Sequence, residues 1–355
     1  MKKKIFFIFE KRIKNKKRLF FLYFLSIFWR FFVYLKNIFY EKNILKIKKV
    51  DIPIISIGNL VCGGVGKTPF IIFLYEKLKK NIGIISRGYG SKIGRKNIVV
   101  DKNFLKKDLA KEIGDEPSML LNRLNSLIFV GKDRIKSAEK ARKLNLDAVL
   151  MDDGFQYRKL HRDIDIVILN AKNVFSNGCF IPRGFLRENP KRLKKADFIV
   201  INNIKDRLDY EIAKQKIVKY ARCPIIAVTP FIKNIVGEKS VGFFVKKIAV
   251  FCAIANPQFF IRLLEDKGYE IVEKFFLLDH SFFSKKKLKQ FFIKAKKNGA
   301  EAVFCTEKDW VKLFDLKDLE VFYVKIDLKI LFGEENMEKL ISSIEKKIYI
   351  SKKGK

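Results

Sequence analysis

No CxxC pair occurs in this chain of 355 residues, although it contains five cysteines. A structural zinc site or a thiol–disulfide centre would need cysteines in closely spaced pairs, and here they are scattered. Two of them, Cys252 and Cys305, lie inside apolar runs typical of strands. We therefore predict that the cysteines are reduced and that the protein faces the cytoplasm.

Acidic residues are also scarce: the chain has 38 aspartates and glutamates but 75 lysines and arginines, which gives a formal charge of +37. Such a charge is typical of nucleic-acid-binding proteins. Lysine, however, is frequent in every segment, and no basic and aromatic module of the RRM or OB type is present. We therefore predict no nucleic-acid partner; a membrane-anchored nucleic-acid binder is an alternative that rests on charge alone. The charge favours anionic membranes and phosphorylated substrates.

The N-terminal region lacks the small-residue cleavage site of a secretory signal peptide. Residues Lys2–Arg18 are densely basic and Leu19–Leu35 are apolar and aromatic, but residues 36–38 are Lys-Asn-Ile, which argues against export. The apolar run falls short of the roughly 20 residues of a spanning helix and contains Arg30. We predict a helix lying in the cytoplasmic leaflet of the inner membrane, peripheral or monotopic. An ordinary buried helix is the alternative.

After Asp51 the chain alternates short apolar runs with amphipathic helical patterns. The runs are IPIISIGNL, IGIIS, LIFVGKD, DAVLMDD and DIDIVIL, and ADFIVINNI and CPIIAVTPF extend the series. Continuous β-branched runs separated by helices indicate a parallel sheet covered on both faces. The predicted fold class is therefore α/β, with a parallel sheet of the P-loop NTPase type.

A second α/β unit begins near Val241, where IAVFCAIA indicates a buried strand. Asn256 and Pro257 then mark the start of a helix, and Thr306 is spaced as a cap over another. With 355 residues, of which 48% are apolar, the chain is long enough for two such domains. We predict a membrane-associating segment at 1–45, a P-loop domain at 46–230 and a smaller α/β domain at 231–355.

The segment Gly58–Pro69, GNLVCGGVGKTP, directly follows an apolar strand and directly precedes a helical pattern. This is the context of a P-loop, whose strict pattern is G-x-x-x-x-G-K-[ST]. The strict pattern has glycine at position 61, where this chain has Val61, so the match is to a variant. Pro69 suits the first helical turn, where its missing N–H is no loss.

The chemistry of this loop depends on its backbone. Glycines that adopt positive φ let the amides wrap phosphate oxygens, whose charge the helix N-terminus also attracts. Lys67 would reach the β and γ phosphates, and Thr68 would place its hydroxyl on Mg²⁺. We predict that ATP and Mg²⁺ bind here. The predicted nucleotide-binding residues are Gly63, Gly64, Val65, Gly66, Lys67 and Thr68.

Pairs of carboxylates lie at the end of another strand and at an expected helix start. Asp152 and Asp153 end DAVLMDD, and the carboxyl ends of parallel strands meet at one sheet edge, so we predict that they lie near Mg²⁺. A simple Asp-Asp-Gly turn is the alternative. Asp115 and Glu116 lie in GDEP at an expected helix start, where taken alone the pattern favours capping.

The chain has only two histidines. His161 begins an HRD triplet like that of protein kinases, but Ile168 stands where asparagine is expected, so we reject that interpretation. His280 follows Asp279 in a loop after an expected strand. Its imidazole could orient a carboxylate or relay charge with it, or be structural.

In their order, these segments resemble the tetraacyldisaccharide 4'-kinase (lipid A 4'-kinase) family from about Pro53 to Leu313. The matching pieces are SIGNLVCGGVGKTP, ISRGYG, GDEPSMLL, DDGFQYRKLHRD, IPRGFLRE, AIANPQFF, DHSFF and TEKDWVKL. The resemblance implies a kinase that transfers the ATP γ-phosphate to the 4'-hydroxyl of a tetraacyldisaccharide 1-phosphate lipid, giving lipid IVA. Separately, we expect a monomer. The acyl chains of that lipid stay in the bilayer, which would explain the apolar N-terminus.

The same resemblance implies roles for individual residues. Asp115 would be the base that accepts the sugar hydroxyl proton, assisted by His280 from the second domain after closure of an interdomain cleft; Lys67 would also be catalytic. Asp152 and Asp153 match the metal-associated pair of the family. The other matching cleft positions are Arg87, Tyr89, Glu116, Arg134, Arg187 and Glu188.

The chain departs from the family pattern at two positions. Tyr157 replaces the histidine of DGFQH, which removes any role of that imidazole, although the phenol can still donate a hydrogen bond. Phe185 replaces a proline.

A P-loop ATPase or GTPase that acts as a switch at the membrane is the main alternative. The P-loop alone does not exclude it, whereas the lack of an NKxD-like motif and the apolar N-terminus argue against it.

Overall fold

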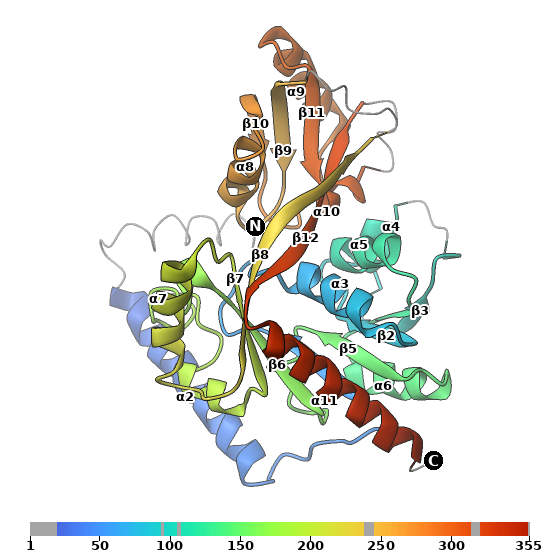
Figure 1. Ribbon diagram of the computed structural model, residues 1–355, viewed down its shortest axis with the longest axis vertical. Helices are drawn as coiled ribbons and strands as arrows, with labels where there is room; N and C mark the ends of the chain where they lie inside the picture. The colour runs from blue at the N-terminus through green and yellow to red at the C-terminus, as the bar shows by residue number, and fades with distance from the viewer. Residues whose placement is uncertain (1–19, 94–95, 105–107, 238–244, 314–319, 354–355) are drawn as a thin grey trace. The chain divides into compact units, whose positions relative to one another are not determined.

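The chain forms two compact units in this computed structural model, which describes residues 20–93, 96–104, 108–237, 245–313 and 320–353 (Figure 1). Unit 1 contains the described residues up to Arg87, Asp133–Thr229 and those from Leu328 onward. Unit 2 contains Gly88–Lys132 and Pro230–Asp327.

This division differs from the predicted domains at 46–230 and 231–355 in two segments. The chain does pass between units near residue 230, but residues 88–132 cluster with unit 2 and residues 328–355 with unit 1. The buried ion pair between Arg123 and Glu307, 2.8 Å long, helps to hold the first segment in unit 2. Contacts of this kind join residues far apart in sequence, so the order of motifs along the chain does not reveal them.

Unit 1 contains a sheet in which the strand order is β8-β7-β6-β1-β5-β2. Each adjacent pair is parallel, as the sequence predicts. Side chains on both faces are buried, because helices cover both faces of such a sheet. The strands are β1 (Ile54–Gly58), β2 (Ile82–Ser86), β5 (Ala148–Asp152), β6 (Ile164–Asn170), β7 (Phe198–Asn202) and β8 (Ile225–Val236).

The helices of unit 1 include α11, which crosses the strand region in Figure 1. Ion pairs attach α11 to the loops at the start of β2 and β5, from Lys352 to Asp147 at 2.6 Å and from Glu345 to Lys80 at 3.7 Å. The helices are α2 (Phe20–Glu41), α3 (Lys67–Leu78), α6 (Arg134–Lys143), α7 (Arg207–Ile217) and α11 (Glu334–Lys353), with 3₁₀ turns η1 (Ala171–Asn173) and η2 (Pro190–Lys195).

Unit 2 has parallel strands in the order β10-β9-β11-β12. These are β9 (Lys247–Cys252), β10 (Glu270–Phe276), β11 (Ala302–Thr306) and β12 (Phe322–Phe332), which continues into unit 1. The predicted caps are confirmed, since Asn256 accepts from Phe259 N at 3.2 Å and Thr306 accepts from Asp309 N at 3.1 Å. The helices are α8 (Pro257–Glu265), α9 (Lys285–Lys297) and α10 (Glu307–Trp310).

The two faces of strand β9 explain how this part of unit 2 is covered. Side chains alternate along a strand, so Ile248 and Val250 pack with α8 while Ala249 and Phe251 pack with α9. Figure 1 shows the two helices close to β9 and β10. A continuous apolar strand thus needs a helix on each side, as its sequence indicates.

The rest of unit 2 comes from residues 88–132. Here the run LIFVGKD forms β4 (Ile128–Val130), which pairs antiparallel with β3 (Ile98–Val100). The run LIFVGKD thus forms a strand, as predicted. Its antiparallel partner β3 is not one of the predicted runs, so the structure adds an antiparallel pair to the predicted parallel series. Two short helices, α4 (Leu109–Ile113) and α5 (Asp115–Arg123), lie between these strands in sequence.

Helix α2 contains most of the apolar N-terminal run. Residues 21–41 are long and apolar enough to cross a membrane by length and composition. Several of its aromatic side chains are exposed, which argues against the alternative of an ordinary buried helix. The basic segment Lys2–Arg18 lies outside the described residues. The exposed residues of α2 include Phe21, Phe24, Phe28, Trp29, Phe31, Phe32 and Tyr34.

Two positions on α9 test the packing of unit 2. Phe291 is 6% exposed and its ring lies 5.6 Å from that of Phe275, whereas Ile293 on the same helix is 72% exposed. We expect Phe291→Ala to lower the free energy of unfolding of unit 2 by about 3–5 kcal/mol, because it leaves a cavity. Ile293→Ala should change it by less than about 0.5 kcal/mol.

The measurement is urea denaturation followed by Trp310 fluorescence in a Trp29→Phe background, since the chain has two tryptophans and Trp310 lies in unit 2. Equal losses in the two variants would contradict the described packing.

Candidate active site

The P-loop joins the end of β1 to the start of α3 in unit 1. Two of its glycines have positive φ, 113° at Gly63 and 94° at Gly66, which other residues rarely adopt. Gly66 immediately precedes α3, so the loop and the first turn of the helix direct backbone N–H groups toward one region. The predicted P-loop context, strand then glycine-rich turn then helix, is therefore present.

Asn202 holds this loop from the end of strand β7. Its side-chain nitrogen donates to the carbonyl oxygen of Val65 at 2.9 Å, and the residue is 5% exposed. A Cβ atom at Gly66 would collide with the same amide group. Glycine is thus required at position 66 by space as well as by φ. Asn202 is not among the residues predicted from the sequence, where the available signal was a pair of asparagines at the end of a buried strand.

Asp153 lies at the centre of the polar groups beside the loop. Arg187 binds it with both terminal nitrogens, at 2.7 Å and 2.8 Å, and Lys67 Nζ lies 3.6 Å from Oδ1. Arg134 donates to its carbonyl oxygen at 2.7 Å. Its backbone has φ 52°, a conformation that this set of contacts maintains.

The charges around Asp153 decide its ionisation. Burial alone would raise the pKa of this carboxyl, but the hydrogen bonds from Arg187 and the positive charges of Lys67 and Arg134 outweigh it. The pKa therefore lies well below the ordinary value of an aspartate. Unit 1 thus brings together four of the predicted site residues, which are Asp153, Lys67, Arg187 and Arg134.

Three further positions lie near this cluster. Arg187 also donates to Asn59 Oδ1 at 3.1 Å, which ties it to the P-loop. The guanidinium of Arg134 lies 5.1 Å from the centre of the Tyr157 ring, so the residue that replaces the family histidine contacts the cluster through its aromatic face. Burial lowers the pKa of Arg134, and the nearby charge of Arg87 lowers it further.

The predicted magnesium ligand Asp152 lies at the same sheet edge as the P-loop. Strands β1 and β5 pair directly, with Ile57 opposite Asp152, so the aspartate and the P-loop lie at the ends of neighbouring strands. Within the described residues there is no group of three or more acidic, histidine or cysteine side chains that could hold a metal. Mg²⁺ in kinases commonly takes only one or two protein ligands and otherwise binds phosphates and water.

Glu188 is buried, at 2% exposed, and its carboxylate accepts a hydrogen bond from Asn37 of helix α2 at 3.1 Å. Arg158 donates to both the carbonyl and the side-chain oxygen of Asn37, each at 3.0 Å. The segment that supplies Arg187 is thereby attached to α2. Glu188, predicted from the resemblance as a cleft residue, is bound to the N-terminal helix.

In unit 2, Asp115 and His280 form a direct pair. His280 Nδ1 lies 2.9 Å from both carboxylate oxygens of Asp115. Asp115 is the first residue of α5, and its Oδ1 accepts a hydrogen bond from the backbone N–H of Glu116 at 2.9 Å. Its carboxylate therefore binds a first-turn amide, as the capping interpretation expects, and also contacts His280. The pair is complete within one unit, which corrects the expectation that Asp115 and His280 come from two domains and meet on closure.

Other groups surround this pair within unit 2. The ring centre of Tyr89 lies 5.0 Å from that of His280. Burial alone would raise the pKa of Asp115, but Lys308, the hydrogen bond with His280 and Lys312 outweigh it, so its pKa lies well below the ordinary value. Asp115 is therefore an ionised carboxylate throughout the physiological range. Neither lysine is among the site residues predicted from the sequence.

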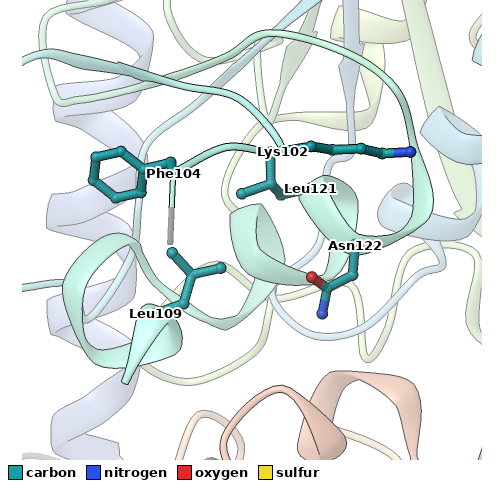
Figure 2. Close-up of a pocket in the computed structure, with 5 residues that line it drawn as sticks. All are labelled: Lys102, Phe104, Leu109, Leu121 and Asn122. Atoms are coloured by element: carbon teal, nitrogen blue, oxygen red, sulfur yellow. The ribbon is translucent and has the colours of Figure 1, made fainter. Parts of the chain in front are cut away.

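A separate cavity of about 350 Å³ lies in unit 2 beside α4 and α5 (Figure 2). None of the predicted site residues lines it. Its lining residues are Lys102, Phe104, Leu109, Leu121 and Asn122.

The sequence profile of the family described as tetraacyldisaccharide-1-P 4'-kinase matches residues 18–346. The chain belongs to this family. The resemblance predicted from eight short motifs is thereby confirmed.

Individual members of the kinase family match over most of their length. The tetraacyldisaccharide 4'-kinase of Chlamydia abortus is 38% identical over 281 residues, covering 76% of this chain and 74% of that protein. The one from Blochmanniella pennsylvanica is 32% identical over 343 residues, covering 95% and 96%. A crystal structure of LpxK from Aquifex aeolicus in complex with ATP is 29% identical with a TM-score of 0.69, covering 90% of this chain and 97% of that one.

We expect Asn202→Ala to weaken ATP binding by this family member about fivefold to tenfold, because the P-loop loses the hydrogen bond that orients the Val65 carbonyl. The measurement is the Kd for ATP by calorimetry. Asn203→Gly is the matched control, since it removes the same side chain one position further along, and glycine tolerates the φ of 65° at this residue. Equal effects of the two changes would contradict a specific role for Asn202.

Proposed function

We propose that this chain transfers the γ-phosphoryl group of ATP to the 4'-hydroxyl of a tetraacyldisaccharide 1-phosphate, forming lipid IVA in lipid A biosynthesis. The observation that carries the proposal is the Asp115–His280 pair, with 2.9 Å between the imidazole and the carboxylate, in a member of the kinase family. A carboxylate paired with an imidazole can receive the proton of an alcohol. An ATPase or GTPase switch, which transfers phosphate to water, has no need of a separate acceptor site.

ATP binds on unit 1 in this proposal. The backbone of Gly63–Gly66 and the first turn of α3 hold the phosphates, and Lys67 moves from Asp153 to the β and γ phosphate oxygens. Arg187 and Arg134, already at Asp153, add positive charge beside the transferred group. Together these groups neutralise charge that the reaction spreads over the phosphoryl oxygens.

Thr68 and Asp152 are the residues we assign to Mg²⁺, with Asp153 beside them. When bound, the ion neutralises charge on the β and γ phosphates and helps to orient them. Asp153 itself is held by Arg187 through both oxygens. We therefore assign Asp153 to organising Arg187 and Lys67 around the phosphates.

The acceptor sugar binds on unit 2 in this proposal, with its 4'-hydroxyl at Asp115. The oxygen of that hydroxyl forms a bond to the γ phosphorus, the bond from this phosphorus to the β,γ-bridging oxygen breaks, and ADP leaves. The hydroxyl proton passes to the Asp115–His280 pair and then to solvent. Because Asp115 is ionised, it is ready to accept a hydrogen bond from the alcohol and orient it for in-line attack.

We further propose that α2 binds the cytoplasmic face of the inner membrane as a peripheral or monotopic helix, where the acyl chains of the substrate lie. The exposed rings of Phe24, Phe28 and Trp29 support this, since exposed aromatic residues partition into the interfacial region. The excess of positive charge favours anionic lipid. We propose that the protein acts as a monomer and without nucleic acid.

The reaction itself is tested by adding the protein and ATP to the disaccharide 1-phosphate lipid and analysing the lipid extract by mass spectrometry. We expect one added phosphate per acceptor. Lys67→Ala should reduce the rate by at least about a hundredfold, because it removes charge stabilisation at the γ-phosphate. Asp115→Asn should reduce kcat by about a hundredfold or more while the Kd for ATP stays within about twofold.

Two results would contradict the proposal. One is ATP hydrolysis at the same rate with and without the acceptor, and with no phosphorylated lipid, which would favour the switch. The other is loss of ATP binding in Asp115→Asn, which would assign this residue to the nucleotide site.

The membrane assignment is tested with Phe24→Ser/Phe28→Ser, two changes at side chains that are 55% and 62% exposed. Burial of a phenylalanine stabilises by about 1.5–3 kcal/mol, so we expect binding to anionic phospholipid vesicles to weaken by at least about a hundredfold in co-sedimentation. Phe282→Ser, at a residue 40% exposed in unit 2, is the control and should leave binding unchanged. Unaltered sedimentation of the double variant would refute the assignment.

A further inference from the structure

We propose that Lys308 and Lys312 are positioning residues for the phosphoryl transfer, because together they clamp the two chain segments that supply Asp115 and His280. The inference rests on the proposed function, in which Asp115 and His280 receive the proton of the acceptor hydroxyl. Both lysines lie in the motif TEKDWVKL, which belongs neither to the P-loop nor to the Asp115–His280 pair.

Lys308 connects the two segments directly. Its Nζ lies 3.0 Å from Asp279 Oδ1, next to His280 in the chain, and 3.8 Å from Asp115 Oδ2. It also lies 3.5 Å from Glu116 Oε1. One ammonium group thus contacts carboxylates on α5 and on the loop after β10.

Lys312 makes a second connection from a buried position. Its side chain is 0% exposed, and its Nζ lies 3.7 Å from Asp115 Oδ2. The same nitrogen donates to the carbonyl oxygen of Ser281, the residue after His280, at 3.3 Å. A buried cation therefore contacts the carboxylate on one side and the backbone that carries the imidazole on the other.

The surrounding structure places both lysines toward the pair. Lys308 lies in α10 and Lys312 four residues later, so the two are about one helical turn apart and point to the same side. Asp309 is fully buried and accepts hydrogen bonds from Lys312 at 2.7 Å and from the backbone N–H of Ala253 at 3.0 Å. Asp309 thus anchors Lys312, and the residue directly after β9 anchors Asp309.

The charges that face Asp115 come from three elements. Lys308 and Lys312 come from α10 and the turn after it, His280 comes from the loop after β10 with Asp279 beside it, and Glu116 is the neighbour on α5 itself. Burial would lower the pKa of Lys308, but Glu116, Asp115 and Asp279 outweigh it and raise the pKa, so the lysine stays charged. Its loss would leave three carboxylates close together with one cation fewer.

Unit 2 also offers a matched control for a purely structural ion pair. Arg123 on α5 binds Glu307 on α10 at 2.8 Å, with both side chains buried. It joins the same two helices as Lys308, and its described ion-pair partners, Glu307 and Asp327, do not include Asp115. Arg123→Met therefore tests the effect of loosening the contact between α5 and α10. Lys308→Met tests, in addition, the effect of removing a charge that contacts Asp115.

The deciding measurement is the NMR spectrum of the His280 imidazole at a fixed pH. The chain has two histidines, so His161→Gln leaves His280 as the single imidazole. We expect the ¹⁵N chemical shift of His280 Nδ1 to change in Lys308→Met, since the ion pair that holds the His280 segment beside Asp115 is lost. Lys308→Arg should return it toward the parent value, and Arg123→Met should leave it unchanged.

Kinetics give the second readout. In Lys308→Met we expect kcat for lipid phosphorylation to fall about tenfold or more, with the KM for ATP within about twofold of the parent. If Lys308→Met does not fold, Lys308→Gln replaces it, since that side chain can still donate to Asp279 but carries no charge. An unchanged Nδ1 chemical shift in the folded variant, or an equal change in Arg123→Met, would overturn the inference.

The NMR result does not depend on the acceptor. If the parent protein phosphorylates no lipid, the proposed function fails, while the Nδ1 chemical shifts still show whether the lysines act on the Asp115–His280 pair.

Discussion

The parallel pairing of β1 with β5 determines where the chemistry of unit 1 can occur. It places the start of the P-loop and the Asp152–Asp153 turn at the same edge of the sheet, with Ile57 opposite Asp152. Everything else at this edge depends on that register. Arg187 reaches both Asp153 and Asn59, and Gln156 donates to the carbonyl of Asn59 at 2.7 Å. A shift by one residue would direct the side chains to opposite faces and separate these groups.

Both candidate sites use the same electrostatic arrangement, an acidic side chain held ionised by several cations. Asp153 has Arg187 and Lys67, and Asp115 has Lys308 and Lys312. Burying a carboxylate is costly unless it is paired, so these cations are required for a carboxylate to persist in a buried site. A chain with 75 basic and 38 acidic residues can surround each buried acid with more than one cation. The uneven composition is thus compatible with an enzyme of anionic substrates.

Helix α2 has two different faces. Its aromatic side chains, such as Phe28, are exposed, while Asn37 and Tyr40 are buried against the loops of unit 1. Asn37 donates a hydrogen bond to Glu188, and the residue before Glu188 in the chain is Arg187, which binds Asp153. The element proposed to bind the membrane and the segment that organises the phosphate site are therefore in direct contact.

Much of this could be predicted from the sequence, because the relevant patterns are local. The strand-to-helix context of GNLVCGGVGKTP, the capping residues Asn256 and Thr306, and the apolar run of α2 each depend on neighbours a few residues away. The resemblance identified Asp115 and His280 as catalytic residues. From the local sequence alone, Asp115 could be a helix cap and His280 could be structural. Asp115 was found by family motif, since its local context favoured a helix cap.

What only the tertiary structure decided involves residues far apart in the chain. Asn202 supports the P-loop across 137 positions, residues 88–132 join unit 2 rather than the P-loop unit, and His280 meets Asp115 inside that unit. Sequence patterns report periodicity and local hydrogen bonding, which arise within one element. Contacts between elements depend on strand order and on which charges share a buried space, and these are properties of the packed chain.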